Sequence, residues 1–133
     1  MIVDSSALLA LIFHEADAER VTAALAEAES CAMGAPTWAE TAIVLAAKLG
    51  EGSRPILSRL SEDLDLVIVP FTAAHGREAR EAFFRFGRGH HPAALNYGDC
   101  LTYAVARLAR QPLLFVGDDF KKTDLVPAWK SDR

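Results

Sequence analysis

Four acidic residues stand at positions from which their side chains could meet in a folded α/β protein. Asp4 ends the apolar run MIVD, and Asp118 ends a second apolar run, LLFVGD. Glu40 and Asp99 each lie in the first turn of a segment that has the apolar pattern of a helix. In open parallel sheets, ligands bind at the carboxyl ends of the strands. We therefore predict that acids from four distant parts of the chain meet at one edge of a sheet.

Such a cluster of carboxylates predicts a metal site. Two carboxylates about 4 Å apart repel by roughly 4 kcal/mol at an effective dielectric constant near 20, and further acids add to this cost. A bound cation offsets the repulsion. A site made only of oxygen ligands favours Mg²⁺ or Mn²⁺.

Each acid also has a purely structural explanation, because carboxylates commonly satisfy the free N–H groups at the start of a helix. The structural alternatives are a cap at Asp4, a capping box from Thr37 to Glu40, an Asn96 cap with Asp99 favoured by the helix dipole, and a turn at Asp118. Any one of these is plausible by itself. Together they would require four coincidences at one edge of the sheet.

The elements that must position these acids alternate along the chain. Apolar runs bounded by Gly, Pro and polar residues predict strands, and longer segments with helical periodicity predict helices. We expect strands at 1–4, 31–35, 66–69 and 112–116, and helices at 5–13, 16–28, 36–50, 52–63, 72–86 and 98–110. Strands separated by helices imply a parallel sheet with helices on both faces. The predicted fold class is α/β.

The composition supports a globular protein and excludes several classes. The chain has 133 residues, 51% of them hydrophobic and 24% charged, which predicts a single domain over 1–133. Neither a membrane span nor an export signal is recognisable, so we expect a cytoplasmic protein without a membrane partner. Cys31 and Cys100 are expected to be buried thiols. A net charge of −4 argues against broad affinity for nucleic acids.

Longer motifs around the acids point to a known family. The segments IVDSSAL, LNYGDCLTYAVA and LLFVGDDFKKTDL, with a glutamate at position 40, resemble the four motifs of PIN domains, specifically VapC-like toxins of prokaryotic toxin–antitoxin pairs. The resemblance runs from the first residue to about Val126. It implies a three-layer α/β/α PIN-like fold with a central, mainly parallel sheet. It also implies an endoribonuclease dependent on Mg²⁺, with Mn²⁺ as an alternative, usually a homodimer and silenced by a cognate antitoxin.

The resemblance also assigns roles by position. The acidic quartet matches Asp4, Glu40, Asp99 and Asp118, with Asp119 as a rival for the fourth place and Ser6 and Asn96 at supporting positions. Asp4 and Asp99 are assigned to a first metal ion. Glu40 and Asp118, or Asp119, are assigned to a second ion or to orienting the attacking water. Carboxylate-held metal ions supply the nucleophile and the counter-charge that phosphodiester hydrolysis needs.

A basic stretch near the third acid could contact RNA. Arg85, Arg88, Lys121 and Lys122 could hold phosphates, and Phe86 could stack on an unpaired base. The alternative is that the two arginines only complement the carbonyl end of a helix.

Other function classes fit less well. A phosphatase of the haloacid-dehalogenase type needs a second acid where Ser6 stands and a later acid where Lys122 stands. A phosphoreceiver domain needs a central Asp after a middle strand, where this chain has Val69-Pro70-Phe71. A non-catalytic α/β binding module, in which the acids are only caps, stays open.

Overall fold

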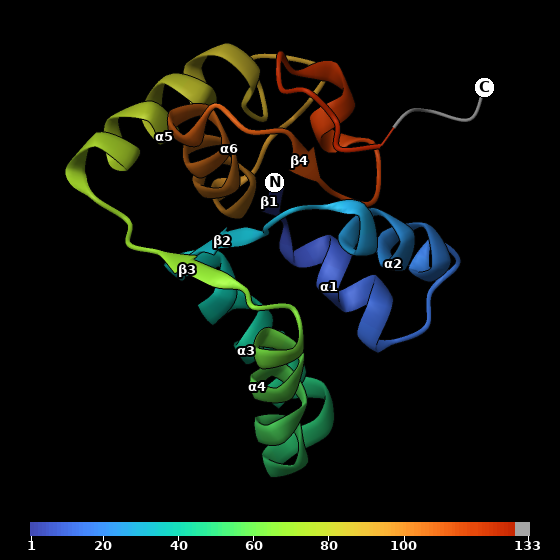
Figure 1. Ribbon diagram of the computed structural model, residues 1–133. Helices are drawn as coiled ribbons and strands as arrows, with labels where there is room; N and C mark the ends of the chain where they lie inside the picture. Colours follow the sequence, from blue (N-terminus) through green and yellow to red (C-terminus); the bar gives the residue numbers. More distant parts are fainter. Residues whose placement is uncertain (130–133) are drawn as a thin grey trace.

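The centre of the molecule is a sheet of four parallel strands in the order β3-β2-β1-β4 (Figure 1). The computed structural model describes residues 1–129. Its strands are β1 (Ile2–Val3), β2 (Ala32–Gly34), β3 (Val67–Val69) and β4 (Leu113–Leu114). Its helices are α1 (Ser5–Ile12), α2 (Ala18–Glu27), α3 (Ala35–Leu49), α4 (Arg54–Asp63), α5 (Ala73–Phe86) and α6 (Tyr97–Ala109), with the short 3₁₀ helices η1 (Gly50–Ser53) and η2 (Asp119–Lys122).

The strand register sorts alternate side chains to opposite faces of the sheet. Ile2 pairs with Leu113, and Val3 pairs with Leu114. Ile2 and Leu113 belong to one buried cluster, whereas Val3 and Leu114 belong to another. This alternation is the two-residue period of a strand that is buried on both faces.

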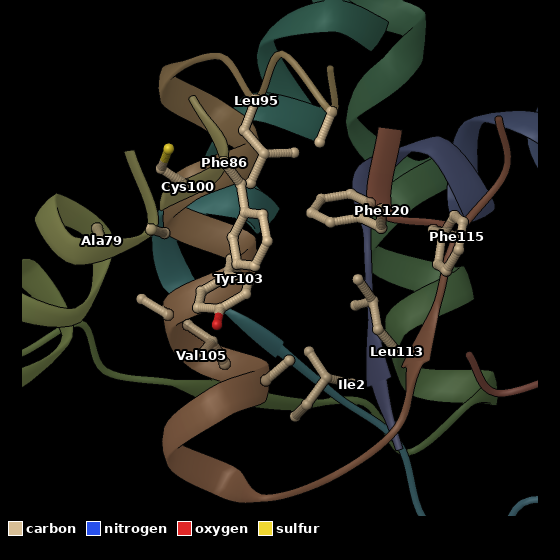
Figure 2. Close-up of a cluster of buried hydrophobic side chains, with 14 residues drawn as sticks. Ile2, Ala79, Phe86, Leu95, Cys100, Tyr103, Val105, Leu113, Phe115 and Phe120 are labelled. Atoms are coloured by element: carbon tan, nitrogen blue, oxygen red, sulfur yellow. The ribbon is translucent and has the colours of Figure 1, made fainter. Parts of the chain in front are cut away.

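Each face of the sheet is covered by its own set of helices. Figure 1 shows α5 and α6 on one side and α1 to α4 on the other. The first cluster, drawn in Figure 2, packs Phe86 of α5 and Tyr103 of α6 with Phe115 and Phe120 from the C-terminal part. The second cluster is built around Leu8 of α1 and residues of α2, α3 and α4. The predicted three-layer α/β/α fold is confirmed.

The carboxyl ends of the strands lead into the segments that carry the acids. β1 runs into α1 through Asp4, and β2 runs directly into α3 at Ala35. β4 is followed by Val116 and a turn with Gly117 at φ +99°, from which η2 begins. Because the paired strands are all parallel, these ends lie at the same edge of the sheet.

The predicted elements are all present, with strands shorter than expected. β3 lies at the edge of the sheet, so Val67 and Ile68 are 56% and 40% exposed. Cys31 and Cys100 are free and buried, as predicted. Within residues 1–129, no helix is both long and apolar enough to cross a membrane.

Candidate metal-dependent nuclease site

Asp4 is the most firmly held of the acids. It is the N-cap of α1 and only 6% exposed. One carboxylate oxygen, Oδ2, accepts hydrogen bonds from the backbone N–H of Ser6 at 3.1 Å and from the Ser6 hydroxyl at 2.7 Å. The other, Oδ1, accepts one from the Thr102 hydroxyl of α6 at 2.8 Å. The predicted cap at Asp4 is therefore real, but α1 uses only one of its two oxygens.

Ser6 joins two strand ends. Its hydroxyl donates to Asp4 and accepts a hydrogen bond from the backbone N–H of Val116 at 3.0 Å. Val116 follows β4, so this side chain connects the end of β4 to the end of β1. A change at Ser6 would disturb both the carboxylate and the start of the segment that leads to η2.

Asp99 lies in the first turn of α6 and forms a capping box with Asn96. The backbone N–H of Asn96 donates to Oδ2 of Asp99 at 3.1 Å, and the backbone N–H of Asp99 donates to Oδ1 of Asn96 at 2.9 Å. Desolvation raises the pKa of Asp99 from 3.8 to about 6, against the hydrogen bond from Asn96. The negative charges of Asp4, Asp119 and Glu40 each make up a smaller part of this rise.

Glu40 reaches the same place from α3. A Cβ atom built on Gly98 would lie 3.0 Å from Oε2 and 3.3 Å from Oε1 of Glu40, so the carboxyl group lies over the first turn of α6. Although the residue as a whole is exposed, desolvation of this group and the charge of Asp4 raise its pKa, while a hydrogen bond from Ser5 lowers it. A side chain at position 98 would therefore press on this carboxyl group and displace it by a few tenths of an ångström.

The two adjacent acids after β4 differ in their surroundings. Asp118 has a side chain that is 81% exposed and forms an ion pair with Lys121 at 3.1 Å. Asp119 begins η2, and its charge is one of those that raise the pKa of Asp99. The charges of Asp4, Glu40 and Asp119 therefore act on Asp99, and the charge of Asp4 also acts on Glu40.

The predicted capping box at Thr37 is wrong. α3 begins at Ala35 with Gly34 as its N-cap and Pro36 in its first turn, so Thr37 already lies inside the helix. Its buried hydroxyl lies 3.2 Å from that of Thr102 instead. The presence of Glu40 in this helix therefore has no capping explanation.

The model of the PIN domain family matches residues 1–126 of this sequence. This chain belongs to the PIN domain family. The match removes the phosphatase and phosphoreceiver alternatives.

Relatives of this PIN domain carry ribonuclease names. It is 52% identical to ribonuclease VapC36 of Mycobacterium tuberculosis over 126 residues, which cover 94% of this chain and 91% of the relative. It is 42% identical to ribonuclease VapC30 of the same species over 130 residues, covering 95% and 96%.

Two solved structures share the fold at 18% sequence identity. One is M. tuberculosis VapC20, a toxin described as cleaving the sarcin-ricin loop, with a TM-score of 0.76 over 94% of this chain and 95% of that one. The other is a toxin–antitoxin complex from Klebsiella pneumoniae, with a TM-score of 0.70 over 98% of both chains.

The basic residues expected at an RNA surface are not equally available in this PIN domain. Arg85 forms an ion pair with Asp124 at 3.1 Å and lies over the ring of Phe86 at 4.7 Å. Lys121 is paired with Asp118. Among residues 1–129, Arg88 and Lys122 are exposed and form no ion pair.

The expectation that Phe86 stacks on a base is wrong. Phe86 is 8% exposed and packs against Tyr103 inside the first cluster (Figure 2), and the ring of His91 forms an edge-to-face contact with it. The neighbouring Phe83 and Phe84 are 40% and 61% exposed and form edge-to-face contacts with His90. These two rings, and not Phe86, are accessible on α5.

The sequence reasoning missed Thr102, whose hydroxyl reaches Asp4. A signal was present, because Thr102 is a polar residue within the apolar run LTYAVA of a buried helix. A buried hydroxyl needs a hydrogen-bond partner. The sequence could not say that the partner lies at the opposite end of the chain.

Proposed function

We propose that this protein is a metal-dependent endoribonuclease that acts as the toxin of a type II toxin–antitoxin pair. The observation that carries the proposal is the convergence of Asp4, Glu40, Asp99 and Asp119 from four separate segments. Desolvation, and after it the negative charges of the other three acids, raise the pKa of Asp99, as expected for a site that favours a bound cation. The ribonuclease names of relatives covered over nearly their whole length support the same activity.

The donor set fits a small, hard cation. Within the described part of the chain, no three His, Cys, Asp or Glu side chains form a ready-made ligand set. Mg²⁺ does not require one, because it keeps several waters and is commonly bound by one or two carboxylates together with substrate phosphates. We assign Asp4 and Asp99 as its ligands, with Mn²⁺ as an alternative ion. Such an ion would supply an activated water and stabilise the charge that develops on the phosphate.

The remaining acids have separate roles in this proposal. Glu40 is assigned to orient the attacking water and to accept its proton at a carboxyl oxygen, and its raised pKa supports this role. Asp119 takes the fourth acidic position in preference to Asp118, because its charge acts on Asp99 whereas Asp118 is paired with Lys121 at the surface. Ser6, Thr102 and Asn96 hold Asp4 and Asp99 in orientation through the hydrogen bonds described above.

RNA contact is proposed for the exposed cations and rings beside this edge. Arg88 and Lys122 can pair with phosphates, and Phe83 and Phe84 offer faces on which unpaired bases can stack. Arg85 is engaged with Asp124 and Lys121 with Asp118, so binding RNA through either would require exchange of an existing ion pair. A cognate antitoxin as inhibitor and a homodimer as the assembly belong to the same proposal.

The direct test is RNA cleavage by protein purified free of antitoxin. Total RNA should be cut at discrete sites in Mg²⁺ or Mn²⁺ and stay intact in excess chelator. Asp4→Asn should be inactive, because it removes the charge at nearly constant shape. Intact RNA with both metal ions, or full activity in chelator, would refute the proposal.

A further inference from the structure

Among residues 1–129, the one hydrogen bond that the Asp4 carboxylate accepts from outside its own turn comes from Thr102. Its hydroxyl donates to Oδ1 of Asp4 at 2.8 Å across 98 positions of sequence. Thr102 is 1% exposed, so water does not compete for this bond. The contact fixes α6, which carries Asp99 in its first turn, to the end of β1.

Thr102 departs from what a helical threonine usually does. Inside a helix, the hydroxyl of Thr normally donates to the carbonyl four residues earlier. Thr41, buried in α3, behaves in this way and donates to the carbonyl of Thr37 at 2.8 Å. Thr102 directs its proton to Asp4 instead. The local helix therefore does not explain its orientation.

The Thr102 hydroxyl has a second buried partner, the hydroxyl of Thr37. A hydroxyl has one proton to donate and two lone pairs to accept with. Since Thr102 gives its proton to Asp4, the 3.2 Å contact between Thr37 and Thr102 has Thr37 as the donor. The result is a buried chain of two hydrogen bonds. Thr37 of α3 donates to Thr102 of α6, and Thr102 donates to the carboxylate of Asp4 after β1.

We propose that Thr102 is a positioning residue for Asp4, and that Thr37 orients the Thr102 hydroxyl so that it donates to this carboxylate. This inference rests on the proposed function, because it concerns how Asp4 presents its free lone pairs to a divalent ion. With Oδ1 tied to α6 and Oδ2 tied to Ser6, rotation of the carboxylate is restricted. The ion then meets a fixed ligand and not one that must be ordered on binding.

The experiment compares four single variants with the wild type. Thr102→Val removes the donor and keeps the branched shape, whereas Thr102→Ser keeps the donor. Thr37→Val removes the orienting hydroxyl. Thr41→Val is the matched control, because it makes the same change in a buried threonine of α3 whose hydroxyl does not reach the acids. Mn²⁺ affinity is measured by titration calorimetry without RNA, and the metal concentration for half-maximal cleavage is measured separately.

Thr102→Val should weaken Mn²⁺ binding and raise the half-maximal metal concentration by about 10- to 100-fold, the range found for groups that orient metal ligands. Thr102→Ser should restore both values to within a few-fold of wild type. Thr37→Val should have a smaller effect, because Thr102 keeps its proton, and Thr41→Val should match wild type. If Thr102→Val does not fold, the comparison of Thr37→Val with Thr41→Val decides. Equal metal affinities for Thr102→Val and Thr41→Val, or for Thr37→Val and Thr41→Val if Thr102→Val does not fold, would overturn the inference.

The same data separate this inference from the proposed nuclease activity. If the wild type binds Mn²⁺ but cuts no RNA, and Thr102→Val weakens binding, the positioning role stands and the nuclease proposal fails. If the wild type binds Mn²⁺ and cuts RNA while Thr102→Val matches Thr41→Val, the positioning role alone fails. A wild type that neither binds Mn²⁺ nor cuts RNA in either metal ion refutes both.

Discussion

Replacement of Asp99 by asparagine should stabilise the metal-free protein while abolishing its activity. Between about pH 4 and 6, the folded protein keeps a proton on Asp99 that the unfolded chain has already lost. The free energy of unfolding therefore falls as the pH rises through this window, and it stays lower above it. Asp99→Asn removes this cost. The amide oxygen of the new side chain can still accept the hydrogen bond from the backbone N–H of Asn96.

The size of the effect follows from the pKa of Asp99. A rise from 3.8 to about 6 corresponds to roughly 3 kcal/mol at 1.36 kcal/mol per unit. Since the side chain is only partly buried, solvent screening reduces the expected gain to about 1–2 kcal/mol. In a domain of this size, such a gain would raise Tm by roughly 4–8 °C.

The assay is urea unfolding of wild type and Asp99→Asn in excess chelator at about pH 4 and about pH 8. The variant should be more stable at the higher pH and close to wild type at the lower. Glu19→Gln is the control, because Glu19 is an exposed acid in the first turn of α2. It should instead lose a few tenths of a kcal/mol of favourable dipole interaction. If Asp99→Asn is no more stable than wild type at the higher pH, desolvation and the neighbouring acids do not disfavour the charge of Asp99 as inferred.

Three further changes test separate parts of the site. Asp119→Asn should reduce the rate of single-turnover RNA cleavage by orders of magnitude, and Asp118→Asn by no more than a few-fold. The reverse order would show that Asp118 is the fourth acid of the site. Gly98→Ala places a Cβ atom 3.0 Å from Oε2 of Glu40, so the rate of RNA cleavage should fall. Tm should be kept or raised, because Ala is favoured over Gly in helices by about 0.5–1 kcal/mol. An unchanged cleavage rate would show that the position of Glu40 does not matter. Arg88→Ala should lower the slope of log affinity for RNA against log salt by about 0.7, measured by fluorescence anisotropy, and an unaltered slope would place the RNA surface elsewhere.

The fold could be predicted because its strands and helices have strong local signals. The apolar runs at 1–4 and 112–116 are buried on both faces of a parallel sheet, and the periodic segments between them are amphipathic. The first and last residues of each helix and strand are less clearly marked in the sequence. Pro36 is favoured in the first turn of a helix, which agrees with the helix expected at 36–50 and not with the alternative of a cap at Thr37.

Contacts between distant segments could not be predicted from local patterns. Nothing near Thr102 in the sequence indicates that its partner is Asp4, and the aromatic residues at 83, 84 and 86 look equivalent until packing buries one of them. Likewise, Asp118 and Asp119 are adjacent acids after the same strand. Only the turn at Gly117 and the start of η2 decide which of them acts on Asp99.

The central claim, that the acids at this edge bind a divalent ion, is tested most directly by locating that ion. Crystals of the protein soaked in Mn²⁺ should give an anomalous-difference peak about 2.1 Å from carboxylate oxygens of Asp4 and Asp99. The same peak should be absent from crystals of Asp4→Asn. A protein that cleaves RNA in Mn²⁺ but shows its ion at other residues would contradict the account.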